Sequence, residues 1–159
     1  DLVRSRGLGD VYKRQVMGHA SEADEVIRRR SFLSEAVGKR VGSSLVTMVD
    51  DGTIAKADGS IPYDSEGTPS SRTIIIENGI YKGFMHSIET AAALNSKPTG
   101  NGRAQDYNRR VWVRMTNTFF EPRDWKLEEM ISNTKDGLLA LKGLSGMEDP
   151  VVVDSKQGQ

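Results

Sequence analysis

The dipeptide Asn78-Gly79 limits the choice of fold more than any other stretch of this 159-residue chain. It stands between two runs of apolar, branched and aromatic residues, Thr73 to Glu77 and Ile80 to Phe84. Both central residues of a type I′ turn need positive φ, which asparagine and glycine adopt more readily than other residues. The sequence therefore predicts a β-hairpin, two antiparallel strands joined by a two-residue turn.

Further elements follow from the spacing of apolar residues. Ser44 to Val49 and Val111 to Phe120 are rich in β-branched and aromatic residues, which predicts strands. Helical spacing and end signals predict helices at Ala20 to Arg30, Ser87 to Leu94 and Trp125 to Leu139. We expect Ser87 to cap the second helix, with Thr90 in place of the capping-box acid. The pattern predicts an α+β fold with a mostly antiparallel sheet, a motif helix near the N-terminus and a packed helix near the C-terminus.

The charges of the chain balance, with 22 basic against 22 acidic side chains. No net field therefore attracts the chain to nucleic acid or to an anionic membrane, and no apolar run approaches the length of a membrane span. We expect a soluble, cytoplasmic protein with one core and with neither nucleic-acid nor membrane partners. With no cysteine and two histidines, only histidines and carboxylates remain as side-chain metal ligands.

His19 is the main candidate for a chemical role. It lies in the stretch Val16 to Asp24, where Glu22, three residues further on, is expected on the same face of a helix. A histidine and a carboxylate so placed can share a metal ion or a proton. A surface ion pair or a capping interaction is the commoner arrangement for such residues. The spacing alone leaves these alternatives open.

Other polar clusters have ordinary structural explanations. Asp50 and Asp51 precede Gly52, which is typical of a turn, although adjacent carboxylates can also act as acid and base or hold a cation. His86 has no acidic or histidine partner at a motif spacing, so we expect a structural histidine at the start of a helix. The Gly-Asn-Gly loop at residues 100–102 lacks the further residues of a dinucleotide fingerprint or a P-loop, which argues against a phosphate cradle.

Residues 1–15 have neither helical nor strand periodicity, because basic residues and glycines interrupt every short apolar group. They contain no initiator methionine, and nothing in their spacing leads into the helical pattern that follows. We interpret them as a non-native leader; a disordered native arm is the alternative.

Six blocks, in one order along the chain, resemble the TldD/PmbA family of metallopeptidases, also called the modulator-of-gyrase family. They are GHASEAD at 18–24, LVTMVDDGT at 45–53, DSEGTP at 64–69, IENGIYKG at 76–83, PTGNG at 98–102 and RMTNT at 114–118. The resemblance runs from about Val16 to Asp149, and no single block carries it alone. It implies a partial metallopeptidase domain of TldD type at residues 16–150, followed by a divergent tail at residues 151–159.

The resemblance implies zinc-dependent hydrolysis of peptide bonds in peptides or unfolded proteins, at a His-Glu-x-x-x-His helix and a distant cysteine. His19 matches the second histidine and is the implied metal ligand. The first histidine and the catalytic glutamate would stand where this chain has Arg14, which cannot ligate zinc, and Gln15, which cannot act as a base. The cysteine would lie beyond Gln159. We therefore assign no catalytic residue and expect the chain as written to be inactive.

Two classes of function remain open. In the first, the chain is a fragment of an active zinc peptidase whose glutamate would take a proton from zinc-bound water. Its two histidines, five residues apart, need a local helix distortion, for which Gly18 is suited. In the second, the substitutions are native and the chain resembles the non-catalytic PmbA/TldE-type subunits. The resemblance also implies a homo-oligomer or a hetero-oligomer with such a subunit.

Overall fold

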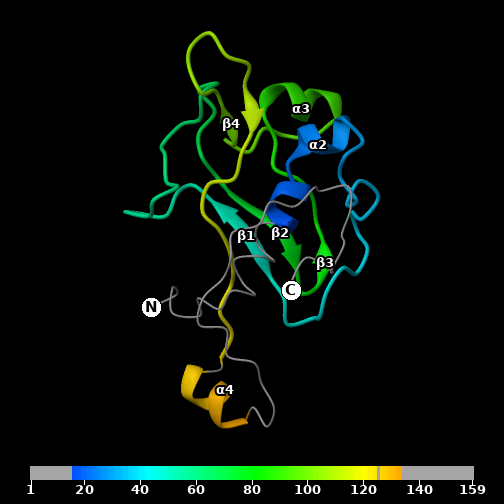
Figure 1. Cartoon of the computed structure of the whole chain (residues 1–159), viewed down its shortest axis with the longest axis vertical. Helices are drawn as coiled ribbons and strands as arrows, with labels where there is room; N and C mark the ends of the chain where they lie inside the picture. The colour runs from blue at the N-terminus through cyan, green and yellow to red at the C-terminus, as the bar shows by residue number, and fades with distance from the viewer. Residues whose placement is uncertain (1–15, 125, 134–159) are drawn as a thin grey trace, which may run out of the picture.

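The computed structural model describes residues 16–124 and 126–133 (Figure 1). Its centre is a four-stranded sheet with the order β3-β2-β1-β6. The strands are β1 (Met48–Asp51), β2 (Arg72–Glu77), β3 (Ile80–Tyr81) and β6 (Thr118–Phe120). A smaller sheet pairs β4 (Gly102–Arg103) with β5 (Trp112–Val113). Every strand pairing in the two sheets is antiparallel, which confirms the predicted α+β class.

The predicted hairpin is present between β2 and β3, which pair through a two-residue loop. Asn78 and Gly79 have φ angles of 49° and 80°, both positive as the turn type requires. A Cβ added to Gly79 would overlap the carbonyl oxygen of Gly42. Glycine is therefore needed here for the turn and for the segment that packs against it.

The first predicted helix is interrupted. Residues 16–20 are helical, and α2 (Ala23–Ile27) begins only after a break at Glu22. Glu22 is extended, with φ −75° and ψ 119°, and forms a parallel bridge with Met85. The prediction of one continuous helix from Ala20 to Arg30 is wrong, because pairing with Met85 takes the place of helical hydrogen bonds at this point.

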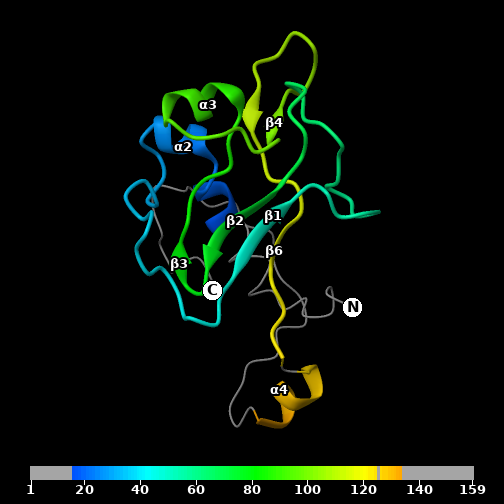
Figure 2. The same cartoon turned by 180° about the vertical axis from the view of Figure 1, so that it is seen from behind.

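The second predicted helix is confirmed as α3 (Ile88–Ala93), with Ser87 as its N-cap. The Ser87 side chain accepts from the backbone N–H of Thr90, and the Thr90 side chain accepts from the backbone N–H of Ser87 at 2.9 Å. This is the predicted capping box. The third helix, α4 (Leu127–Asn133), lies within the predicted range, and residues 125 and 134–139 of that range lie outside the described residues. Figures 1 and 2 show α4 beyond the end of β6, apart from the other labelled elements.

The strand predicted at Val111 to Phe120 is in fact two strands, β5 and β6, in different sheets. Between them the backbone N–H of Thr116 donates to the Asp50 carboxylate at 2.9 Å. A side chain of β1 thus takes the hydrogen bond that a neighbouring strand would otherwise accept, and the chain passes from one sheet to the other. The other three predicted strands are present with different ends, since β1 runs from Met48 to Asp51, β2 starts at Arg72 and β3 stops at Tyr81.

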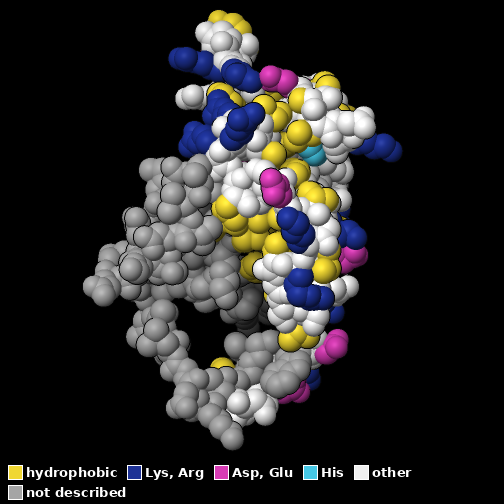
Figure 3. All heavy atoms as spheres, turned by 90° about the vertical axis from the view of Figure 1, so that its right-hand side faces the viewer, with side chains coloured by type: hydrophobic (Ala, Val, Ile, Leu, Met, Phe, Trp, Pro, Cys, Tyr) yellow, Lys and Arg dark blue, Asp and Glu magenta, His cyan; other side chains and the backbone are white. Residues whose placement is uncertain are grey.

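One apolar core joins the main sheet, the N-terminal helical residues and β5. Its buried members are Ala20, Leu33, Met48, Ile75, Ile76, Tyr81, Met85 and Val113. Several large apolar side chains remain exposed, among them Leu45 and Ile131. Figure 3 shows hydrophobic side chains interspersed with polar and charged ones on the face in view, with a larger group near its middle. None of the helices in the described ranges is both long and apolar enough to cross a membrane.

Candidate functional site

His19 lies near the end of the helical residues 16–20. The preceding residue, Gly18, faces Met115, and a Cβ at Gly18 would overlap the Met115 sulfur. The missing side chain therefore lets the connector between β5 and β6 pack closely against the helix that carries His19. We also expected Gly18 to allow a helix distortion that brings positions 14 and 19 to one metal ion. Position 14 lies outside the described residues.

His19 and Glu22 are in contact, as their spacing predicts. His19 Nδ1 lies 3.1 Å from Glu22 Oε1. The imidazole side chain is 40% exposed, whereas the Glu22 side chain is 2% exposed. The contact does not need a continuous helix, because the N–H of Glu22 donates to the carbonyl of His19 at 3.1 Å and so turns the chain. One imidazole nitrogen is therefore held by a buried carboxylate while the ring reaches the surface.

Arg114 holds the other oxygen of Glu22. Its Nη1 donates to Glu22 Oε2 at 3.0 Å and to the carbonyl of Val113 at 2.9 Å. Asn101 fixes the Arg114 backbone, since its carbonyl accepts from the Arg114 N–H at 2.8 Å and its Nδ2 donates to the Arg114 carbonyl at 2.9 Å. Glu22 and Arg114 are 92 positions apart, and no spacing in the sequence connects them.

Burial raises the pKa of Glu22 above its ordinary value, because removal from water penalises the charged form. The hydrogen bond with His19 and the positive charge of Arg114 lower this pKa, but by less than burial raises it. The stability of the ionised Glu22 carboxylate therefore depends on its contacts with both His19 and Arg114.

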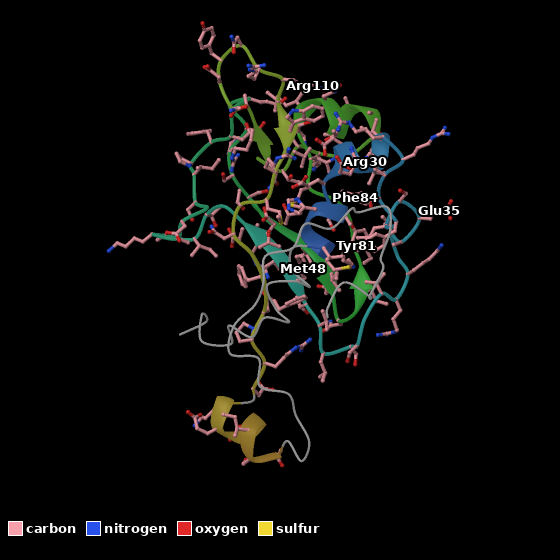
Figure 4. All side chains as sticks on the ribbon, viewed as in Figure 1. Arg30, Glu35, Met48, Tyr81, Phe84 and Arg110 are labelled. Carbon is pink, nitrogen blue, oxygen red and sulfur yellow. The ribbon has the colours of Figure 1, made fainter. Side chains whose placement is uncertain are left out.

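Ser21 connects the helix that carries His19 to the main sheet. Its hydroxyl donates to the carbonyl of Met17 at 2.6 Å and accepts from the Tyr81 hydroxyl at 2.9 Å. Burial raises the pKa of Tyr81, so the phenol remains a donor. In Figure 4 Tyr81 and Phe84 lie near each other beside the N-terminal helical residues, and their rings meet edge to face with centroids 5.4 Å apart.

Asp50 and Asp51 have different environments. Asp51 Oδ1 accepts from the backbone N–H of Thr53 at 2.8 Å, which forms the predicted turn. Asp50 is only 1% exposed. It accepts hydrogen bonds from Asn101 Nδ2, from the backbone N–H and hydroxyl of Thr116, and from the hydroxyl of Thr118. Because protein donors surround both of its oxygens, we assign Asp50 a structural role that the turn pattern did not indicate.

The Gly-Asn-Gly loop that leads into β4 binds protein carboxylates. The N–H of Gly102 donates to Asp64 Oδ2 at 2.9 Å. Asp64 Oδ1 accepts from the backbone N–H groups of Glu66 and Thr68, both at 2.9 Å. Glu66 Oε2 in turn accepts from the N–H of Ile88 at the start of α3, at 2.8 Å. The Gly102 N–H, a donor that a bound phosphate would need, is thus already paired with a carboxylate. This supports the interpretation that the loop is not a phosphate cradle.

His86 lies at the start of α3, as expected, and is 4% exposed. Its Nδ1 lies 3.3 Å from Thr90 Oγ1, and its backbone N–H donates to Thr99 Oγ1 at 2.7 Å. Burial lowers the pKa of His86 because the imidazolium form loses its hydration. Within the described ranges, no three histidine, aspartate or glutamate side chains group to hold a metal ion. Arg14 and Gln15 lie outside those ranges.

Comparison with known proteins gives a consistent set of similarities. A sequence profile of the PmbA/TldA metallopeptidase C-terminal domain matches residues 5–158. A metalloprotease of Methanocaldococcus jannaschii is 48% identical over 139 residues, 87% of this chain and 30% of that protein. A zinc metalloprotease TldD homolog of Saccharolobus solfataricus is 34% identical over 137 residues, 86% of this chain and 30% of that protein. The crystal structure of TldE from Thermococcus kodakarensis shares the fold, with a TM-score of 0.65 and 24% identity, over 73% of this chain and 26% of that chain.

Proposed function

This chain belongs to the PmbA/TldA metallopeptidase family, and we propose from this that it is part of a zinc-dependent peptidase. The proposed reaction is hydrolysis of peptide bonds in peptides or unfolded proteins. The relatives named metalloprotease support the reaction class, and the relative named zinc metalloprotease supports the metal. The chain spans about 30% of the length of these relatives, so the proposal concerns the whole protein.

The setting of His19 carries the proposal. Its Nδ1 is bound to Glu22, and no hydrogen bond joins its Nε2 to any residue in the described part of the chain. An imidazole with one nitrogen held by a carboxylate and the other free is the usual form of a histidine that binds zinc. His19 therefore fits a metal ion as one ligand.

Zinc, when bound in such a site, polarises the peptide carbonyl and lowers the pKa of bound water toward neutrality. From this chain, we propose that His19 holds the metal. Arg14 and Gln15 stand where the family has its first histidine and its glutamate, and Arg14 cannot serve as the ligand nor Gln15 as the base. The cysteine ligand would come from beyond Gln159. The chain as written thus has no proposed catalytic residue.

We further propose that residues 1–15 are a non-native leader, that residues 16–150 are the native part of the domain and that residues 151–159 are a divergent tail. The leader would end inside the motif, while the family blocks begin directly after it. The family profile starts at residue 5, so the boundary needs a direct test. Continuous sequencing of the source DNA across the codons for residues 14–19 provides it. Histidine and glutamate codons before Val16 would support a leader, and contiguous codons for Arg14 and Gln15 would contradict it.

Activity is tested in the full-length protein that carries Arg14→His and Gln15→Glu and continues past Gln159. We expect it to cleave a denatured protein, to stop when a chelator removes the metal and to recover when zinc is returned. The matched control carries Arg14→His alone, which restores the ligand but not the base, and should bind zinc without cleavage. Absence of chelator-sensitive cleavage by the restored protein would contradict the peptidase proposal.

A non-catalytic subunit is the second candidate. It is favoured by the residues at positions 14 and 15, if they are native. Such a subunit would pair with a catalytic subunit of TldD type. Co-purification with a zinc-binding subunit of the same family would support it, and a full-length protein that binds neither zinc nor such a subunit would contradict it.

A further inference from the structure

We propose that Glu22 and Arg114 are positioning residues that hold His19 with its Nε2 lone pair directed away from the protein, available to a metal ion. The inference rests on the proposed role of His19 as a ligand, but its first test needs no metal. Neither residue is expected to touch the metal or a substrate, because both act through the imidazole.

The unequal burial of His19 and Glu22 distinguishes this contact from an ordinary surface pair. In a surface pair both side chains remain hydrated, and the interaction contributes little. Glu22 is 2% exposed, so its carboxylate has lost the water that its two partners must replace. The carboxylate is therefore held where it can make both contacts.

The backbone fixes the position of Glu22. Its N–H donates to the carbonyl of His19 at 3.1 Å. On either side, the N–H of Ala23 donates to the carbonyl of Met85 at 3.1 Å, and the N–H of Met85 donates to the carbonyl of Ser21 at 2.9 Å. The residues before and after Glu22 are thus both bonded to Met85, and the break between the two helices has a defined geometry.

Arg114 is fixed in turn by a buried polar network. Asn101 Nδ2 donates to Asp50 Oδ2 at 2.7 Å, and Asn101 also binds the backbone of Arg114 on both sides. The guanidinium therefore approaches Glu22 from a held loop, although its own side chain is 49% exposed. A continuous series of hydrogen bonds runs from Asp50 to His19.

Ionised Glu22 is compatible with only one neutral tautomer of His19. A carboxylate accepts hydrogen bonds and donates none, so Nδ1 must carry the proton. Nε2 then keeps its lone pair, and the 40% exposure of the ring makes room for a ligand. Neutral histidine in water prefers the proton on Nε2, so the contact with Glu22 reverses the ordinary preference.

The tautomer is measured by ¹⁵N NMR of the histidine-labelled chain at about pH 8, where imidazoles are neutral. His86 is the only other histidine, and its signals report whether each variant folds. We expect His19 to be in the Nδ1–H form, to shift toward the Nε2–H form in Glu22→Leu, and to shift less in Glu22→Gln, whose amide oxygen still accepts. The matched control is Glu25→Gln, which removes a carboxylate paired with Arg30 at 3.2 Å and should leave the tautomer of His19 unchanged.

An Nε2–H tautomer in the unsubstituted chain would overturn the proposal, and so would the same tautomer populations in the unsubstituted and Glu22→Leu chains. If Glu22→Leu does not fold, Glu22→Gln decides by the same criterion.

Arg114 is tested with Arg114→Met. We expect a smaller loss of the Nδ1–H form of His19 than in Glu22→Leu, because the carboxylate remains but is no longer held. Arg110→Met is the matched control, since Arg110 pairs with Glu89 at the surface. Unchanged populations in Arg114→Met would remove Arg114 from the proposal.

Zinc affinity of the full-length protein carrying Arg14→His gives a second readout. Adding Glu22→Gln should weaken zinc binding by about 10- to 100-fold, and adding Glu25→Gln should not; equal affinities would contradict a role for Glu22 at the metal. If the protein with Glu22 intact binds no zinc, the proposed function fails. The tautomer measurement still decides whether Glu22 orients His19.

Discussion

Asn101 Nδ2 donates a 2.7 Å hydrogen bond to Asp50 Oδ2 across 51 positions of the sequence. Asp50 belongs to β1, and Asn101 binds the backbone of Arg114. The contact therefore links the main sheet to the residue that holds Glu22. A buried carboxylate with this many donors is a point at which one substitution affects both stability and the site.

Asp50→Asn is expected to lower the free energy of unfolding by about 2–4 kcal/mol. The asparagine amide keeps only one acceptor oxygen, and its NH2 group cannot accept a hydrogen bond. Donors on Asn101, Thr116 or Thr118 therefore lose a partner. Urea denaturation followed by circular dichroism measures the change. Asp58→Asn, at an exposed position, should change the same quantity by less than about 0.5 kcal/mol. Equal effects of the two substitutions would contradict the role given to Asp50.

Gly79→Ala is expected to destabilise the chain more than Gly67→Ala. Both glycines have positive φ, 80° and 79°, so alanine costs about 1–2 kcal/mol at each for the left-handed backbone. Only at Gly79 does the added Cβ also overlap backbone, the carbonyls of Gly42 and Ser43, whereas nothing lies within 4 Å at Gly67. We expect the difference to be about 1–3 kcal/mol in chemical denaturation. Equal losses would show that the turn is not packed against residues 42 and 43.

The stability of the chain should fall at mildly acidic pH because of His86. Burial lowers the pKa of His86 in the folded state below the value of 6.5 taken for the unfolded state. The unfolded state therefore binds the proton first, so this contribution is fully present above about pH 6.5 and is lost as the pH falls toward the folded-state pKa.

His86→Asn removes the titrating group and should lose less stability than the unsubstituted chain between about pH 8 and pH 5.5. All other groups titrate in both chains, so the difference between the two denaturation series isolates His86. Parallel pH profiles would contradict the prediction.

Structure that depends on neighbouring residues was predictable from the sequence. The turn at Asn78 and Gly79 and the capping box of Ser87 and Thr90 each involve groups within three positions of one another, and both are present. The break at Glu22 is set by pairing with Met85. Met85 is too far along the chain to be part of a local pattern around Glu22. The helical spacing therefore predicted a continuous helix, which the pairing with Met85 interrupts.

The candidate site divides in the same way. The contact between His19 and Glu22 was predicted from a spacing of three residues. The contact between Arg114 and Glu22 was not predicted, because 92 positions separate the two residues. The chain holds 22 lysines and arginines, and the sequence does not indicate which of them contacts Glu22. The place of Arg114 in one of the six family blocks was the only available signal. The separation of β5 from β6 was missed for a related reason, since the Asp50 side chain that binds Thr116 comes from a distant strand.

The packing of Gly18 against Met115 gives a last prediction, on how the helix with His19 is held to the connector with Arg114. A Cβ at Gly18 would overlap the Met115 sulfur, so Gly18→Ala should cost about 1–3 kcal/mol of unfolding free energy through overpacking. Shortening Met115 makes room, and the double variant Gly18→Ala/Met115→Ala should therefore lose less than the sum of the two single losses.

Gly83→Ala is the matched control for Gly18→Ala, because nothing lies within 4 Å of a Cβ there and its φ is not positive. Denaturation of the unsubstituted chain, the two single variants and the double variant gives the coupling energy directly. Additive losses for Gly18→Ala and Met115→Ala would mean that the two residues do not press on each other. The connector with Arg114 would then need another anchor against the helix with His19.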